Sequence, residues 1–307
     1  GEDATRVIEL KPDDLRGYAY RALSLLNRSA YAEAIEDYDQ AIPLDPTNVN
    51  IIHDRGLCFL RTNKLESAIA DFSECIRIDP RYIPAFEDRA TAFRKIGRDV
   101  EASADITRAI ELGVGSASGL KTRARLAIQM GNFDDAIRDS TAYLAEFPNN
   151  AVALMRRGMA YELIGEQEKA LKDYSAVVDA GGINARYAWL WKHYLLPTDD
   201  TPLTAIEATS NGNVDADNRA SVWSCTLLDF AAGKTDNNAL LVTATNNIEQ
   251  SEAIYYIARQ LILEGDSAGA TRALQECIDL GQVDLLEAEF ANALLKRGSG
   301  NDHPTPE

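Results

Sequence analysis

Histidines and a possible phosphate-binding triplet are the residues of this chain whose types could support chemistry. The 307-residue sequence has three histidines, His53, His193 and His303, and they lie too far apart along the chain to suggest a metal site. The triplet Gly233-Lys234-Thr235 lacks the glycine five residues earlier that a phosphate loop needs. Serine-hydrolase, zinc-protease and dinucleotide-binding motifs are absent from the sequence as well. The sequence therefore predicts no catalytic residue, no metal site and no cofactor.

The cysteines give no better sign of a reactive site. Cys58, Cys75, Cys225 and Cys277 form no CxxC pair and have no histidine at zinc-ligand spacing, so we expect them to be buried small residues. Four free thiols are tolerable in the cytoplasm and unusual in an oxidising periplasm. The compartment, periplasm and envelope or cytoplasm, stays open at this point.

Arginine and aspartate recur together at a spacing of 34 residues. Paired charges at a fixed register predict an ion-pair ladder between helices, because a ligand seldom needs the same two residues in every repeat. The arginines are Arg21, Arg55, Arg89, Arg123 and Arg157. The aspartates, sixteen residues after each arginine, are Asp37, Asp71, Asp105, Asp139 and Asp173.

This period sets the elements that must hold the charged pairs. A 34-residue repeat is typical of a helix-turn-helix unit that buries one face by stacking on its neighbours. Starting at Leu15, five units without insertion or deletion fill residues 15–184. Small residues recur where the two helices must approach closely, and larger apolar residues recur between helices. We therefore predict an all-α superhelical solenoid of antiparallel helix pairs.

The repeated residues resemble the tetratricopeptide repeat (TPR). The second unit carries Arg55-Gly56-Leu57, then Ala68-Ile69-Ala70-Asp71-Phe72 and Ile78-Asp79-Pro80. The fifth unit begins with Arg157-Gly158-Met159-Ala160-Tyr161, which follows the same pattern. The resemblance is specific for the fold and implies a non-enzymatic module for protein-protein interaction.

The repeats are flanked by less regular segments. Residues 1–14 are expected to be the second helix of a preceding repeat, so that the natural protein extends upstream of Gly1. Residues 185–250 have the length of two degenerate helical repeats, with helices expected at 185–196, 202–210, 220–232 and 238–246. Residues 251–297 are expected to form a TPR-like unit and a closing helix, and residues 298–307 a disordered tail.

The C-terminal half also resembles the NlpI-type TPR lipoproteins of bacteria. The residues that carry this resemblance are Ala188-Trp189-Leu190-Trp191, Val222-Trp223, Leu227 to Gly233, and Tyr255-Tyr256 through Gly265-Asp266. It covers about residues 151–297 and implies a dimeric scaffold of the periplasm or envelope. The chain has no lipidated cysteine and carries additional repeats upstream.

Helix positions that line the concave groove in TPR proteins supply the candidate ligand-binding residues. They are Asn50, His53, Asp54, Arg61, Glu87, Thr91, Arg94, Lys95, Lys121, Arg125, Gln129, Arg156 and Met159. From Arg94 to Arg156 this predicted groove is basic. A basic stretch favours an acidic segment or a free C-terminal carboxylate of a protein or peptide ligand. The alternative is a solvated charged face beside a ligand site elsewhere.

The overall charge and the aromatic residues bear on further partners. A formal net charge of -17 argues against nucleic acid, and no run of apolar residues is long enough to insert into a membrane. Tyr187, Trp189, Trp191 and Tyr194 span two faces of one predicted helix. They either pack inside the chain or form a contact patch for a homodimer. Besides an adaptor, the sequence is compatible with a regulatory or targeting segment of a larger enzyme and with a structural oligomer.

Overall fold

The computed structural model describes residues 2–113, 117–196, 219–281 and 285–299. These residues form 17 α-helices and one short 3-10 helix, and no strand occurs among them. The predicted all-α fold is confirmed. His303, the expected helix at 202–210 and the tail residues 300–307 lie outside the described ranges. Within those ranges, no helix is both long and apolar enough to cross a membrane.

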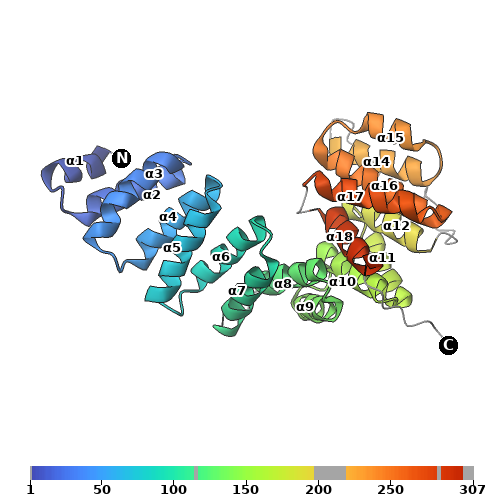
Figure 1. Ribbon diagram of the computed structural model, residues 1–307, viewed down its shortest axis with the longest axis horizontal. Coiled ribbons are helices and arrows are strands. Elements are labelled where there is room, and N and C mark those ends of the chain that lie inside the picture. Colours follow the sequence, from blue (N-terminus) through green and yellow to red (C-terminus); the bar gives the residue numbers. More distant parts are fainter. Residues whose placement is uncertain (1, 114–116, 197–218, 282–284, 300–307) are drawn as a thin grey trace. The chain divides into compact units, whose positions relative to one another are not determined.

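The chain divides into two compact units, residues 1–119 (unit 1) and residues 120–307 (unit 2). Unit 1 consists of antiparallel helix pairs, each packed on the next one along the chain (Figure 1). Its helices are α1 (Glu2–Leu10), α2 (Leu15–Asn27), α3 (Tyr31–Ala41), η1 (Ile42–Leu44), α4 (Val49–Arg61), α5 (Leu65–Ile78), α6 (Ile83–Lys95) and α7 (Asp99–Glu111). Helix α1 packs on α2, where a Cβ added at Gly17 would lie 2.7 Å from the Ile8 side chain.

The turn between the two helices of a repeat has the same backbone conformation in all five repeats. Gly97, Gly131 and Gly165 have positive φ angles there, and Ser29 and Asn63 have φ angles of 61° and 58°. Glycine adopts this left-handed conformation without steric cost, and asparagine tolerates it. The serine and asparagine therefore take the place of glycine in the first two repeats.

Small residues allow the two helices of a repeat to touch. Ala34, Ala68, Ala102, Ala136 and Ala170 are fully buried. A Cβ added at Gly56 would lie 2.7 Å from the Phe72 ring, and one added at Gly158 would lie 2.5 Å from the Tyr174 ring. Real Cβ atoms do not come this close to a ring, so the recurring small residues are required by the packing of the helix pair.

Unit 2 holds the remaining repeats and the C-terminal helices. Most of α8 (Ala117–Met130) belongs to it. The others are α9 (Phe133–Glu146), α10 (Ala151–Leu163), α11 (Gln167–Ala180), α12 (Ile183–Leu195), α14 (Arg219–Ala231), α15 (Asn237–Thr243), α16 (Asn247–Glu264), α17 (Ser267–Asp279) and α18 (Leu286–Ser299). Helices α16 and α17 form a further antiparallel pair joined at Gly265 and Asp266, and Asp266 caps α17 by accepting from the Gly269 N–H at 2.8 Å.

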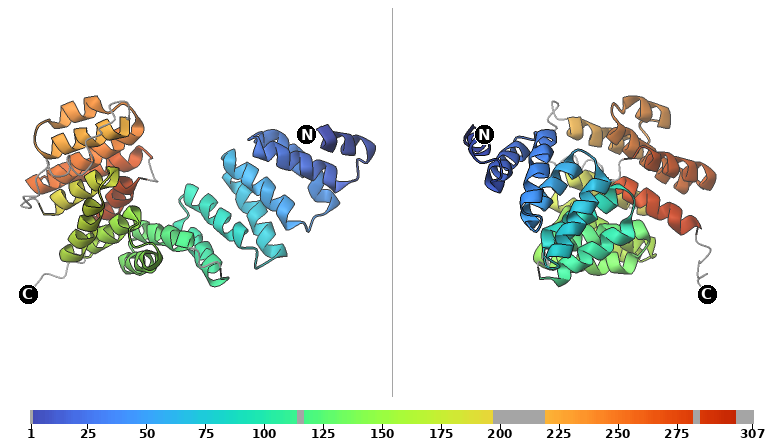
Figure 2. Two further views of the ribbon diagram at one scale, coloured as in Figure 1. Left: turned by 180° about the vertical axis from the view of Figure 1, so that it is seen from behind. Right: turned by 60° about the vertical axis from the view of Figure 1, so that its left-hand side comes forward.

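Helix α18 does more than cover the end of the stack. It packs on its neighbour α17, as a closing helix should, and also on α16 and α10. Figure 1 and Figure 2 both show α18, in red, beside α10. A helix near the C-terminus thus lies against the first helix of a repeat about 130 residues earlier.

Candidate binding surfaces

The arginine and aspartate series forms a two-pronged ion pair inside each repeat. The guanidinium on the first helix donates Nε–H and Nη2–H to the two carboxylate oxygens on the second, at 2.6 to 2.8 Å. The aspartates are between 1% and 6% exposed. Such bidentate contacts to buried carboxylates are among the stronger hydrogen bonds in proteins. The pairs are Arg21–Asp37, Arg55–Asp71, Arg89–Asp105, Arg123–Asp139 and Arg157–Asp173.

The same arginines also reach the second helix of the preceding repeat. Arg55 Nη1 donates to Asp39 at 2.6 Å, Arg89 Nη1 to Ser73 at 2.9 Å and Arg157 Nη1 to Thr141 at 3.3 Å. The sequence-based prediction of the ladder missed these acceptors. A signal was available, because Thr5, Asp39, Ser73, Thr107 and Thr141 also recur every 34 residues.

His53 joins two first helices of unit 1. Its Nε2 lies 2.9 Å from Asp88 Oδ2 on α6, and its Nδ1 lies 3.9 Å from Asp54 Oδ1. The ring packs on Phe72 and Tyr82. Burial works to lower the pKa of His53, but the two carboxylates raise it to about 9. This side chain is only 7% exposed, so it supports the surface rather than offering an open contact to a ligand.

The first helices α2, α4 and α6 give unit 1 a face of mixed charge, which we call the first-helix face. Asp54, Glu87 and Asp88 lie near the middle of α4 and α6, and burial raises the pKa of Glu87. Arg61, Arg94 and Lys95 lie at the C-terminal ends of the same helices. Two predicted ligand contacts are used internally, since Asn50 accepts from the Tyr82 hydroxyl and Thr91 donates to the Glu87 carbonyl.

In unit 2 the first helices α8 and α10 surround a basic cavity. The cavity has a volume of about 300 Å³ and is lined by Lys121, Thr122, Arg125, Asn150, Val152 and Arg156. Lys121 is exposed and has no ion-pair partner among the described residues. Three of the predicted ligand-binding residues, Lys121, Arg125 and Arg156, therefore share one cavity. A carboxylate is the kind of group that such a set of donors can bind.

The arginines of this basic cavity also contact Glu289 of α18. Arg156 donates Nε–H and Nη2–H to the two Glu289 oxygens at 3.0 and 2.9 Å, and Arg125 Nε lies 3.8 Å from Oε1. The Glu289 side chain is fully buried. Near the other end of α18, the Lys296 ammonium donates to the Gln129 carbonyl. The chain thus supplies an acidic group of its own to this surface.

Comparison with known families identifies the repeats. A family model for the tetratricopeptide repeat matches residues 2–49 and 121–183, and a second such model matches residues 49–82. The chain contains tetratricopeptide repeats. No curated protein sequence matches it.

Two solved TPR structures resemble part of the chain. YrrB, described as a TPR protein with an unusual peptide-binding site, is 22% identical, with a TM-score of 0.53 over 57% of this chain and 91% of its own. MamA is 22% identical, with a TM-score of 0.50 over 53% of this chain and 88% of its own. At this level of identity the likeness shows the fold alone.

Some residues predicted to line the TPR groove are covered in the structure. Gln129 is 8% exposed, Arg156 is 7% exposed and Met159 is fully buried. The physical reason is α18, which contacts α10 directly and bonds to Gln129 and Arg156. The expectation that these three residues face an open groove is therefore wrong for unit 2 as it stands.

The aromatic residues of α12 do not form a surface patch. Trp189, Trp191 and Tyr194 are 7%, 1% and 4% exposed, and Tyr187 is largely buried, with its hydroxyl donating to Glu252 at 3.3 Å. The Trp191 indole packs between the Tyr174, Tyr255 and Phe290 rings. They belong to the interior of unit 2, so the reason for placing a dimer contact on them is lost.

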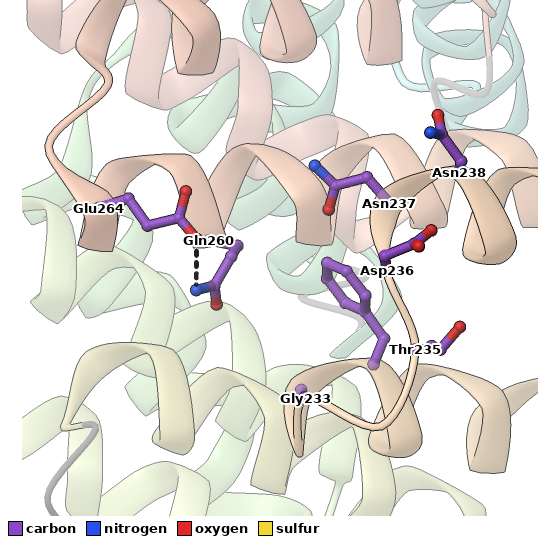
Figure 3. Close-up of a pocket in the computed structure, with 9 residues that line it drawn as sticks. Gly233, Thr235, Asp236, Asn237, Asn238, Gln260 and Glu264 are labelled. Atoms are coloured by element: carbon purple, nitrogen blue, oxygen red, sulfur yellow. Dashed lines mark hydrogen bonds between the residues drawn. The ribbon is translucent and has the colours of Figure 1, made fainter.

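The Gly233-Lys234-Thr235 triplet ends helix α14 and is not a phosphate loop. Gly233 has a φ of 71°, the Lys234 N–H donates to the Asp229 carbonyl, and the Lys234 ammonium pairs with the Asp229 carboxylate at 2.8 Å. Figure 3 shows the nearby hollow of about 500 Å³, where Gln260 donates to Glu264 and Asp236 caps α15. These polar groups already have partners inside the chain, so the hollow is a weak candidate for a site.

The cysteines and the possible metal ligands match this picture. Cys58, Cys75 and Cys277 are buried, while Cys225 is partly exposed. Burial raises the pKa of Cys58 and Cys75 to about 12 and that of Cys277 to about 11. Among the residues that the structure describes, no group of His, Cys, Asp and Glu side chains could hold a metal ion.

Proposed function

We propose that this chain is a non-enzymatic adaptor that binds a partner protein or peptide on its first-helix faces. In unit 2 the partner presents an acidic side chain or a free C-terminal carboxylate to the basic cavity. The observation that carries this proposal is the convergence of Lys121, Arg125 and Arg156 on one cavity in a chain whose net charge is -17. The description of YrrB as a TPR protein with a peptide-binding site supports the class of function.

A cation that is not paired in the chain gains most from an added carboxylate. Lys121 is exposed and has no ion-pair partner among the described residues, whereas Arg156 is already bonded to Glu289. Thr122 and Asn150 add polar groups to the same cavity wall. An incoming carboxylate therefore contacts Lys121 first, and charge complementarity makes this end of unit 2 selective for acidic segments.

The resemblance of residues 151–297 to NlpI-type lipoproteins supports an adaptor of the bacterial envelope. The buried thiols agree with this compartment, because a pKa of about 11 to 12 leaves few of them as reactive thiolates. The same binding role also fits a regulatory or targeting segment of a larger protein.

The test uses a labelled oligoglutamate peptide with the full chain, followed by fluorescence anisotropy. We expect Lys121→Glu to weaken binding about tenfold, the size of one lost charge-assisted hydrogen bond plus a repulsive charge. Lys172→Glu is the matched control, because Lys172 is an exposed lysine on the second helix α11 of the same unit. A peptide with an amidated C-terminus tells a terminal carboxylate from an acidic side chain.

Equal loss of affinity in the two lysine variants would contradict the proposal, since it would mean that the peptide responds to the overall charge of the chain. A photo-crosslinking residue placed at position 121 in a native lysate then identifies the natural partner. The crosslinked peptide should be rich in Asp and Glu or lie at a C-terminus. Position 172 again serves as the control.

A further inference from the structure

Helix α18 is bound on unit 2 in the way that a ligand helix is bound. Its Glu289 side chain is fully buried and takes two hydrogen bonds from Arg156. Its Glu287 accepts from the Tyr256 hydroxyl at 3.1 Å, and its Lys296 reaches the backbone of α8 at Gln129. Helices α8 and α10 are separated from α18 by more than 120 residues of chain. The contacts of α18 are therefore long-range and side-chain specific.

One aromatic side chain anchors the helix. Phe290 is fully buried, and the centroid of its ring lies 5.0 Å from that of Trp191 and 6.3 Å from that of Tyr255. The Arg259 guanidinium lies 5.4 Å from the centroid of the Phe290 ring. Ala291 and Ala293 are also fully buried, which lets the helix backbone approach its seat. An aromatic anchor beside a desolvated ion pair is the usual composition of a binding hot spot.

The open basic cavity is continuous with this seat. Arg125 and Arg156 line the cavity and also face Glu289. An acidic group that enters the cavity therefore competes with Glu289 for the same guanidinium groups. A buried ion pair contributes little net stability, because the desolvation of its charges offsets their attraction. Exchange of Glu289 for another carboxylate is for this reason nearly neutral in free energy.

We propose that α18 is a resident ligand of unit 2, and that a partner helix of the same chemistry displaces it. The partner helix carries a glutamate followed directly by an aromatic residue, with a small residue three positions later, as Glu289, Phe290 and Ala293 do in α18. It binds first through its acidic residues at the basic cavity and then takes the place of Phe290. This inference rests on the proposed function, and it names the partner and its competitor.

The experiment uses a labelled synthetic peptide of residues 285–299 and the full chain. We expect the Glu289→Gln chain to bind this peptide about tenfold more tightly than the wild-type chain, because its own α18 has lost the charge that competes for Arg156. Lys296→Gln is a second variant that loosens α18 without leaving a buried arginine unpaired, and we expect a smaller gain in the same direction. A peptide with the Phe290→Ala change should bind neither variant.

Circular dichroism shows that each variant folds before its binding is compared. The inference is overturned if folded Glu289→Gln and Lys296→Gln chains bind the peptide no better than wild type, or if the Phe290→Ala peptide binds equally well. A stable dimer of the chain alone that exchanges α18 would make a second copy the occupant, and this would overturn the assignment to a partner helix. The oligoglutamate experiment is independent. If Lys121 governs oligoglutamate binding but no exchange occurs, the proposed function stands and the resident-ligand inference fails.

Discussion

Asp105 is 6% exposed, so its negative charge depends on the guanidinium of Arg89 on the facing helix. Replacing Arg89 with alanine leaves this carboxylate buried without its main partner and also removes the bond to Ser73. We expect Arg89→Ala to lower the free energy of unfolding by about 3 kcal/mol, the usual cost of breaking a buried pair from one side. Chemical denaturation of the two chains measures this loss.

The matched control removes both charges. In the chain with Arg89→Met and Asp105→Leu, no buried charge remains unpaired, so most of the lost stability should return. If Arg89→Ala unfolds at the same denaturant concentration as wild type, the pair does not hold the repeat together.

His53 should make unit 1 less stable at high pH. Its pKa is raised from the usual 6.5 to about 9, so the folded state binds the proton more tightly than the unfolded state. The added stability is fully present below about pH 6.5 and is lost as the pH rises through about 9. The wild type should therefore exceed His53→Gln in stability at pH 6, and the two should converge at pH 10. A constant difference across this range would rule out the charged pair with Asp88.

Recurrence decides which residue contacts a sequence can predict. Each charge pair repeats at a fixed register, so the sequence displays the same contact five times. The acceptors Asp39, Ser73 and Thr141 repeat as well, but their chemical types differ, and this variety hid the series. His53 occurs in one repeat only, so its partner Asp88 could not be inferred from periodicity.

Among the elements, α16 carries a buried carboxylate that opposes folding at high pH. Glu252 accepts from the Trp223 indole at 2.6 Å and from the Tyr187 hydroxyl at 3.3 Å. Burial, together with the nearby Glu287 of α18, raises the pKa of Glu252 from 4.5 to about 8. Its proton therefore stabilises the fold fully below about pH 4.5, and this contribution is lost as the pH rises through about 8.

The variant Glu252→Gln keeps the shape of the side chain and cannot ionise. We expect it to be more stable than wild type at pH 9 and to lose that advantage near pH 4.5, as thermal unfolding at several pH values would show. A variant that is less stable than wild type at pH 9 would show that the ionised carboxylate is tolerated in its place.

The position of α18 marks the limit of prediction at the scale of elements. The sequence indicates a helix near residues 285–297, and the structure has it at Leu286–Ser299. Amphipathic periodicity defines a helix and its apolar face, but it does not define the distant surface that the face covers. The bonds from Glu289 to Arg156 and from Lys296 to Gln129 join residues that are 133 and 167 positions apart. Nothing in the spacing of these residues connects them.

At the scale of the whole molecule, the repeat organisation determines how far a local change spreads. Each repeat of a solenoid contacts only its neighbours, so stability is approximately a sum of local terms. We expect Arg55→Ala to speed amide hydrogen exchange in α4, α5 and the adjoining helices of unit 1, while exchange in α16 and α17 stays unchanged. Arg157→Ala should do the reverse, with faster exchange in α10 to α12 and no change in α2 and α3. The two arginines make equivalent pairs, with Asp71 and Asp173, so the variants differ in place and not in chemistry. Faster exchange throughout the chain in both variants would mean that it unfolds as a single cooperative body, and the additive description of the repeats would then be wrong.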